Sequence, residues 1–210
     1  MTWLEHYRST YYPKLDINFT GAKGMLAAGM YNRACGFDIM WRLLLKQRSQ
    51  DFRIIETGTL RDPGNWTDGQ SARLFTEFVD WHGGQMRSVD IDPHACDIAR
   101  ATIPSDRFDV ACSDSVSWLQ GLTDLETVDL FYLDSYDIDW NNDTPSAEHH
   151  LQEFLIVEPY LRAGTVVAID DNSRWHETNR RTGKGRRVVE YLEGRGIIPI
   201  YDEYQIIFQC

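Results

Sequence analysis

The sequence contains few cysteines and no long run of hydrophobic residues. The cysteines are Cys35, Cys96, Cys112 and Cys210. They form no CxxC pair and lack the spacing of zinc ligands, and free thiols so scattered are typical of a reducing compartment. No apolar segment approaches the ~18 to 20 residues that cross a membrane, and residues 1–6 are too polar for a secretion signal. We therefore expect a cytoplasmic protein with no membrane partner.

Positive charge is also scarce. The 210 residues include 21 Lys and Arg against 32 Asp and Glu, for a formal net charge of −11 and a pI near 4.9. Such a surface repels phosphate backbones, so we expect no nucleic-acid partner. Basic residues are dense only over residues 180–187. This segment is either a solvated loop and helix start or a docking site for an anionic substrate.

The composition and the order of elements predict one α/β domain. Hydrophobic residues make up 42% of the chain and charged residues 25%, which is typical of a soluble globular domain. The strands that we expect are 53–57, 86–90, 107–111, 128–133, 165–169, 197–201 and 205–209. The helices that we expect between them are 69–81, 93–103, 115–122, 147–161 and 185–193. This alternation predicts a mostly parallel sheet between two layers of helices.

The two ends of the chain depart from this alternation. Segments 197–201 and 205–209 are joined by three residues, which is too short for a parallel crossover, so we expect an antiparallel C-terminal hairpin. Residues 1–50 are rich in aromatic residues, with an apolar stretch around 37–45. We interpret them as an N-terminal helical appendage, packed near the carboxyl edge of the sheet, to a main domain over residues 51–210. Its aromatic residues could mediate a homodimer.

Ligands of open α/β sheets bind outside the carboxyl ends of the strands, so the residues after each strand are candidates for a site. The first strand runs into Glu56-Thr57-Gly58-Thr59, where the glycine allows the backbone to approach a ligand closely. The second strand ends at Asp90, which can accept hydrogen bonds from two ribose hydroxyls, while Asp92 before Pro93 fits a helix N-cap. The third strand is followed by Ser113-Asp114-Ser115, polar residues that either bind an adenine edge or cap a helix.

Carboxylates gather after the fourth and fifth strands. Asp134 and Asp137 follow the fourth strand, and Asp170, Asp171 and Asn172 follow the fifth. Like charges this close need a cation or hydrogen-bond donors nearby, and oxygen ligands suit a hard divalent ion such as Mg²⁺. We predict a Mg²⁺ site formed by Asp134, Asp170, Asp171 and Asn172. Alternatively, Asp170 or Asp171 caps the following loop and Asp134 contacts the substrate without a metal.

In order and spacing, these features resemble the class I S-adenosylmethionine-dependent methyltransferases over residues 51–210. The resemblance rests on the Glu56–Thr59 loop, Val89-Asp90-Ile91-Asp92-Pro93, Ser113–Ser115, Leu133-Asp134 and the terminal hairpin. It implies a Rossmann-like three-layer fold, with a seven-stranded sheet whose last strand is antiparallel. It also implies S-adenosyl-L-methionine as the cofactor. The residues implied for its binding are Glu56, Gly58 and Thr59 at the methionine portion, Asp90 at the ribose, and Ser113, Asp114 and Ser115 at the adenine.

Within that family, Leu133-Asp134 and Ile169–Asn172 resemble the metal-dependent O-methyltransferases of the catechol, macrocin and cephalosporin-tailoring types. The sequence departs from them at two places. The loop after Thr59 is longer than the usual glycine-rich turn, so Asp68 and Ser71 could supply the methionine carboxylate contacts at a helix N-terminus. The catechol type has a lysine base three residues after its first metal aspartate, and this position is Asp137 here.

The predicted function is methyl transfer from S-adenosylmethionine to a hydroxyl of a small-molecule acceptor, with Mg²⁺ lowering the pKa of that hydroxyl. The catalytic candidates are Asp134, Asp137 and His149, and His150 is an alternative to His149. A structural role for either histidine stays open. Two other functions stay open as well: metal-independent methylation of a nitrogen or a carboxylate, and non-catalytic binding by a domain that kept the fold. An NAD-linked enzyme is disfavoured because Gly58 lacks the GxxG continuation.

Overall fold

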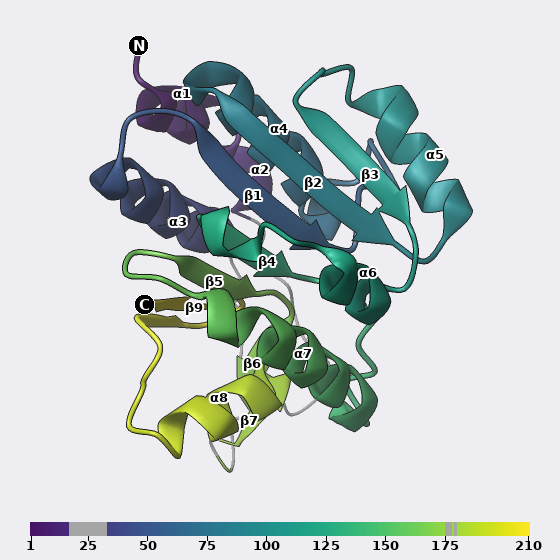
Figure 1. The fold of residues 1–210 in the computed structure, drawn as a ribbon, viewed down its shortest axis with the longest axis vertical. Coiled ribbons are helices and arrows are strands. Elements are labelled where there is room, and N and C mark those ends of the chain that lie inside the picture. The colour runs from purple at the N-terminus through teal and green to yellow at the C-terminus, as the bar shows by residue number, and fades with distance from the viewer. Residues whose placement is uncertain (17–32, 175–177, 179) are drawn as a thin grey trace.

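The computed structural model describes residues 1–16, 33–174, 178 and 180–210. Residues 17–32, which belong to the predicted N-terminal helical segment, lie outside the described residues. The described part of the chain forms a seven-stranded sheet with the order β3-β2-β1-β4-β5-β9-β8, flanked by helices (Figure 1). Its strands are β1 (Phe52–Thr57), β2 (Gly84–Asp90), β3 (Phe108–Cys112), β4 (Leu130–Leu133), β5 (Val166–Ile169), β8 (Tyr201–Asp202) and β9 (Ile206–Gln209).

The strand directions confirm the predicted fold class. β1 to β5 run parallel to their neighbours, β9 is antiparallel to β5, and β8 is antiparallel to β9. The sheet is therefore Rossmann-like, with an antiparallel C-terminal hairpin. The chain fills one half of the sheet with β1, β2 and β3 and then crosses to β4 beside β1. This reversal is the switch point at which doubly wound sheets bind their ligands.

Helices cover both faces of the sheet because successive strand residues point to opposite sides. Ile54 packs into one core cluster and its neighbour Ile55 into the other. The first cluster includes residues of α1 (Trp3–Thr10), α2 (Tyr12–Leu15), α3 (Arg33–Gln47), α4 (Ser71–His82) and α5 (Pro93–Thr102). The second includes residues of α6 (Ser115–Gly121), α7 (Thr144–Val157) and α8 (Arg186–Glu193). None of the described helices is long and apolar enough to cross a membrane.

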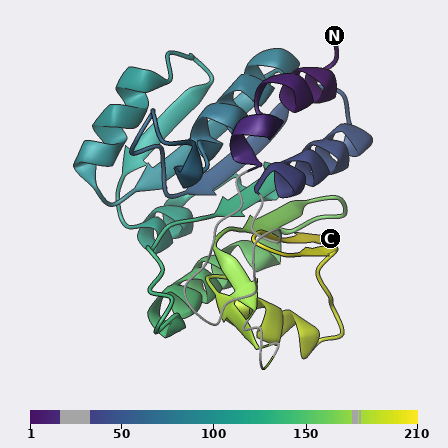
Figure 2. The same ribbon diagram turned by 180° about the vertical axis from the view of Figure 1, so that it is seen from behind.

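The N-terminal helices lie against a face of the sheet, whereas the sequence led us to expect them near its carboxyl edge (Figure 2). α3 contacts β5 and β9. The Trp41 ring stacks on Phe78 of α4 with centroids 4.7 Å apart, and Trp3 meets Trp41 edge-on at 5.4 Å. Burying three such rings requires a broad apolar surface, which the sheet face and α4 provide. Arg33, the first residue of α3, contacts Asp170 at the carboxyl edge.

Two local features differ from the prediction. The strand expected over residues 197–201 is reduced to β8, since Ile197, Ile198 and Ile200 are largely exposed and bury too little surface to order a longer strand. A separate two-stranded sheet joins β6 (Asn172–Arg174) to β7 (Arg181–Gly183). Its short polar strands carry no alternating hydrophobic pattern, so the sequence does not predict them. This hairpin leads the chain back toward the carboxyl end of β5.

Candidate active site

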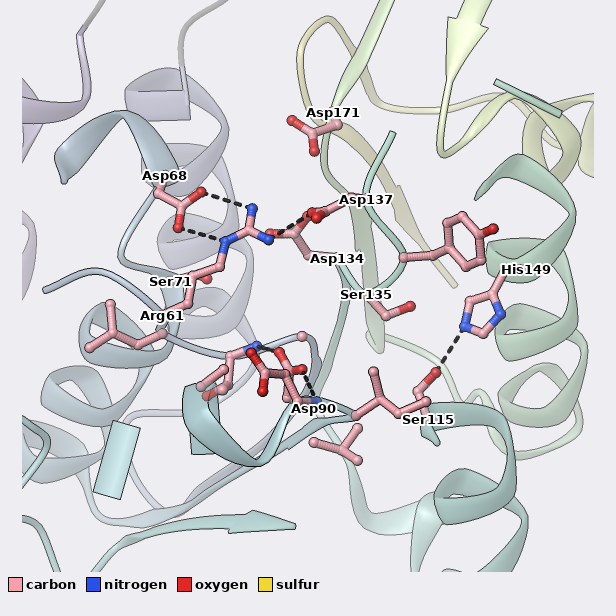
Figure 3. Close-up of a pocket in the computed structure, with 18 of the residues that line it drawn as sticks. Arg61, Asp68, Ser71, Asp90, Ser115, Asp134, Ser135, Asp137, His149 and Asp171 are labelled. Atoms are coloured by element: carbon pink, nitrogen blue, oxygen red, sulfur yellow. Dashed lines mark hydrogen bonds and ion pairs between the residues drawn. The ribbon is translucent and has the colours of Figure 1, made fainter. Parts of the chain in front are cut away.

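A cavity of about 450 Å³ opens at the carboxyl ends of the parallel strands, beside the switch point. This volume is within the range of small-molecule sites. Loops after β1, β2, β3, β4 and β5 all contribute to its wall (Figure 3). The predicted site residues that line it are Gly58, Thr59, Asp68, Ser71, Asp90, Asp114, Ser115, Asp134, Asp137, His149 and Asp171. The structure therefore brings most of the predicted residues to one place.

Gly58 allows the loops after β1 and β4 to touch. Its φ is +85°, a region that favours glycine. A Cβ atom at this position would lie 2.7 Å from the backbone oxygen of Asp134, which is closer than packing allows. The Gly58 N–H donates to the Val89 carbonyl at 2.8 Å. Any side chain here would push β1 and β4 apart and reshape the cavity floor.

Glu56 is buried beneath this loop with an incomplete set of hydrogen bonds. The Ser88 hydroxyl donates to its Oε2 at 2.9 Å, but no described residue donates to Oε1. Burial raises the pKa of Glu56 to about 8, although the Ser71 and Ser88 hydroxyls lower it. A buried carboxyl with one unsatisfied oxygen is costly to a protein. Glu56 is not itself among the cavity-lining residues, but Ser71, whose hydroxyl acts on this carboxyl, is one of them.

Asp90 is held at the end of β2 by backbone donors. The N–H of Thr59 donates to Oδ2 at 3.1 Å and the N–H of Asp92 to Oδ1 at 2.9 Å. Burial raises the pKa of Asp90, while these two N–H groups lower it. The carboxylate lines the cavity with its position fixed by both loops. Asp92 accepts from the His94 N–H at 2.9 Å and caps α5, which confirms the role predicted for it.

Arg61 connects two loops at the cavity mouth, a role that the sequence analysis did not predict. Its guanidinium donates to Asp68 at 3.1 Å and to Asp137 at 2.8 Å (Figure 3). Asp137, a predicted base, is therefore an exposed member of an ion pair, with 76% of its side chain accessible. Asp68 also lies on the cavity wall, beside Ser71 at the first residue of α4. The signal that was missed is the arginine within the unusually long loop.

The segment after β3 caps a helix, and part of it lines the cavity. Asp114 caps α6 by accepting from the Ser117 N–H at 2.8 Å, and this bond lowers the pKa of Asp114. Asp114 and Ser115 also line the cavity, whereas Ser113 is not among its lining residues. The Ser113 N–H instead donates to the Asp90 carbonyl at 2.9 Å and so positions the strand end.

His149 lines the cavity and is oriented by a buried acid that the sequence did not reveal. Its Nε2 is 2.9 Å from the Ser115 hydroxyl and 3.3 Å from Oε1 of Glu153, one helical turn further on. Glu153 accepts from Thr57 at 3.0 Å and from Ser135 at 2.7 Å. Burial would raise the pKa of Glu153, but its hydrogen bonds with His149, Ser115 and Ser135 outweigh burial and lower this pKa to about 2. The hydrogen bond to Glu153 in turn raises the pKa of His149.

His150, in contrast, is structural. It is fully buried, and its Nδ1 lies 2.7 Å from the Ser146 carbonyl within the same helix. Burial lowers the pKa of its ring to about 4, so it stays neutral. It is not among the cavity-lining residues. Of the two histidines, only His149 is placed to meet a ligand.

The predicted Mg²⁺ ligands are paired with side chains of the protein. The Lys184 ammonium lies 2.6 Å from Oδ1 of Asp134 and 2.9 Å from Oδ2 of Asp171. Arg33 lies 2.6 Å from Oδ2 of Asp170 and 3.1 Å from Oδ1 of Asp171. Burial raises the pKa of Asp134 above its usual range, against the opposing effect of Lys184. Within the described part of the chain, no acidic, histidine or cysteine cluster is arranged to hold a metal ion.

Asn172 has a structural role in place of the predicted metal contact. Its amide nitrogen donates to the Ile169 carbonyl at 2.8 Å and to the Asp170 carbonyl at 2.9 Å. Its amide oxygen accepts from the Gly185 N–H at 2.7 Å. The oxygen that would bind a cation is therefore engaged in holding the hairpin. Together with the two cationic side chains, this means that the residues present do not fit the predicted Mg²⁺ site.

Solved structures share this fold at low sequence identity. A human methyltransferase 10 domain-containing protein aligns with 98% of this chain and 97% of its own at a TM-score of 0.53 and 10% identity. SMU.1697c of Streptococcus mutans, solved with SAH, aligns with 81% of this chain and 96% of its own at a TM-score of 0.50 and 10% identity. The search of curated proteins finds no match to this sequence.

A third solved structure is MycE, a methyltransferase from the mycinamycin biosynthetic pathway determined with Mg and SAH. It is 20% identical over 66% of this chain, with a TM-score of 0.45, and the match spans 31% of MycE.

The comparison with family models identifies the family of this chain. A family model described as a methyltransferase domain matches residues 66–172, about half of the chain. The chain therefore belongs to the methyltransferase-domain family.

Proposed function

We propose that this protein transfers the methyl group of S-adenosylmethionine to a small-molecule acceptor bound in the cavity. The observation that carries the proposal is the cavity at the switch point of a methyltransferase-family fold, with Gly58 and Asp90 at its floor. Its lining contains seven aspartates and two arginines. Such a wall favours ligands that carry positive charge, and S-adenosylmethionine carries an ammonium and a sulfonium.

The residues on the donor side fit the parts of this cofactor. Glu56, which is buried behind the cavity-lining Ser71, would attract the ammonium by its charge when ionised. Asp90 would accept from the ribose hydroxyls, because its carboxylate reaches the cavity while backbone N–H groups hold it. Asp114 and Ser115 would lie beside the adenine. When bound, the cofactor supplies an electrophilic methyl group.

The acceptor side is organised around Asp134. Lys184 engages its Oδ1 at 2.6 Å, and among the described residues no side chain donates a hydrogen bond to Oδ2. Because burial raises its pKa, the carboxylate can take a proton from the acceptor as the nucleophile attacks. The main contribution of the surrounding residues is to hold donor and acceptor in line. We propose a hydroxyl as the nucleophile.

An amine is the second candidate for the acceptor. The acidic lining of the cavity favours a cationic ligand over an anionic one, and Asp134 could receive a proton from an amine as readily as from a hydroxyl. Methylation of a carboxylate is disfavoured by the same charge. The Mg²⁺ dependence implied by the family resemblance stays a prediction, and the ion pairs of Lys184 and Arg33 argue against it.

Calorimetric titration of the purified protein with S-adenosylmethionine and with S-adenosylhomocysteine tests the donor site. We expect binding of both and at least a tenfold loss of affinity, about 1.4 kcal/mol, in Asp90→Asn. Asp97→Asn is the matched control, since Asp97 is on α5 with 77% of its side chain exposed and should bind as the wild type does. If millimolar donor does not bind, the proposal is wrong and a non-catalytic domain is favoured.

A further inference from the structure

Lys184 occupies the position between the acceptor-side carboxylates, and this inference rests on the function proposed above. Its ammonium contacts Oδ1 of Asp134, Oδ2 of Asp171 and, at 3.3 Å, the Asp134 carbonyl. These three oxygens match the three N–H donors of a lysine. The side chain is 2% exposed, although its neighbours Asp134 and Asp171 both line the cavity. Lys184 is thus a buried cation directly behind the cavity wall.

The β6–β7 hairpin is shaped to deliver this lysine. Gly183 has a φ of +120°, and a Cβ atom there would lie 2.4 Å from the Asp171 carbonyl oxygen. That carbonyl accepts the Lys184 N–H at 3.2 Å. Asp171 itself has a φ of +53°, a strained value for a residue other than glycine. The positive φ of Asp171 and the missing Cβ of Gly183 together allow β7 to approach the end of β5 closely enough to place Lys184 there.

The charges explain why a cation must be present. Asp134, Asp170 and Asp171 end two neighbouring buried strands, and uncompensated carboxylates there would be very costly. Arg33 neutralises Asp170, with its guanidinium at 2.6 Å. Among the described residues, Lys184 is the second cation at these carboxylates, and it bridges Asp134 to Asp171. A divalent ion could bind these two carboxylates only by displacing the ammonium.

We propose that Lys184 is the resident cation of the acceptor site and takes the place of a divalent metal. It acts as a positioning residue: by engaging Oδ1 of Asp134, it leaves Oδ2 turned toward the acceptor. Methyl transfer by this protein is then independent of divalent cations. Removing the lysine should expose a latent metal site, because the carboxylate oxygens it releases are ligands that Mg²⁺ and Mn²⁺ accept.

The wild-type protein provides the first test and needs no variant. The wild type and Asp134→Asn are titrated with Mn²⁺, and the free ion is measured by electron paramagnetic resonance. We expect the two proteins to give the same titration, because Mn²⁺ does not bind at Asp134 in the wild type. Chelation with EDTA should leave both the melting temperature and the affinity for S-adenosylhomocysteine unchanged. Stoichiometric Mn²⁺ binding that is lost in Asp134→Asn would overturn the inference, because it would show that a metal displaces the lysine.

Lys184→Met provides the second test, since it keeps an unbranched side chain of similar length and removes its charge. Without metal we expect the melting temperature to fall by roughly 10 °C, as for a broken buried ion pair. Mn²⁺ should restore much of this loss and bind at least about tenfold more tightly than to the wild type, because carboxylate charge sets the affinity for such ions. A folded Lys184→Met protein with no gain in Mn²⁺ affinity would refute the proposal.

Arg186→Met is the matched control. Arg186 forms a comparably buried ion pair with Asp143 at 2.9 Å, and it is not among the cavity-lining residues. This variant should lose stability without acquiring Mn²⁺ affinity, so a gain confined to Lys184→Met separates the proposed role from general loss of an ion pair. The proposed function fails separately, if the wild type does not bind S-adenosylmethionine.

Discussion

We expect donor binding to depend on pH through the buried carboxyl of Glu56. Its pKa is about 8 in the folded protein and 4.5 in its ordinary environment. If the cationic donor binds the protein with Glu56 ionised, the Glu56 carboxyl must lose its proton before or during binding. We therefore expect the affinity for S-adenosylhomocysteine to rise about tenfold between pH 6 and pH 7 and to level off above pH 8. Calorimetry at pH 7 in buffers of different ionisation enthalpy should show release of about 0.9 proton.

The same carboxyl links pH to stability. Because its folded pKa is raised, Glu56 stabilises the fold fully below pH 4.5, and this contribution is lost as the pH rises through 8. Glu56→Gln is neutral throughout, so at pH 7 it should raise the free energy of unfolding of the unliganded protein by about 3 kcal/mol. The variant should nevertheless bind the donor more weakly, and with no dependence on pH. A variant that is more stable but binds the donor more weakly indicates that the wild-type residue serves ligand binding at a cost in stability.

Glu148→Gln serves as the control, since 55% of the Glu148 side chain is exposed and it lies on the outer part of α7. It should leave both the pH dependence and the stability unchanged. A wild-type affinity that is constant from pH 6 to pH 8 would contradict the reasoning. So would a Glu56→Gln protein whose affinity keeps the wild-type slope.

Three further predictions concern other parts of the structure. Asp90→Asn should leave the free energy of unfolding within about 1 kcal/mol of the wild type in chemical denaturation, because its amide oxygen can still accept one backbone N–H. Trp41→Ala should lower that free energy by about 3 to 5 kcal/mol, since it empties the centre of the aromatic cluster of α1, α3 and α4; a smaller loss would show that the cluster collapses around the cavity. Glu153→Gln should lower the pKa of His149 in an NMR titration, because Glu153 is the main cause of its increase; an unchanged value would assign the shift to Asp114.

Local sequence signals were sufficient for the sheet and for much of the donor side. Continuous apolar runs such as Leu130–Leu133 predicted central strands, and they are buried on both faces. Because the carboxyl ends of parallel strands meet at one edge, Gly58 and Asp90 could be assigned to one site from their positions in the chain alone. Asp92 before Pro93 predicted a helix cap for the same reason, since capping depends on residues close in sequence.

The cations of the acceptor side could not be found in this way. The carboxylates after β4 and β5 were visible in the sequence. A cluster of carboxylates with no cationic side chain nearby in the sequence predicts a metal ion. Arg33 is 137 residues from Asp170, and Lys184 is 50 residues from Asp134. No sequence pattern links residues this far apart. Lys184 also lies in a basic segment, residues 180–187, whose composition is typical of an exposed surface segment.

What the sequence determined by itself is the alternation of parallel strands and helices in the main sheet and the loops that form the cavity, because hydrophobic periodicity and capping are short-range properties. What only the tertiary structure decided is the electrostatic state of the site. The packing of α3 against the sheet carries Arg33 to Asp170, and the β6–β7 hairpin carries Lys184 to Asp134. A buried carboxylate must be compensated by whichever cation the fold places beside it, and here that cation belongs to the chain.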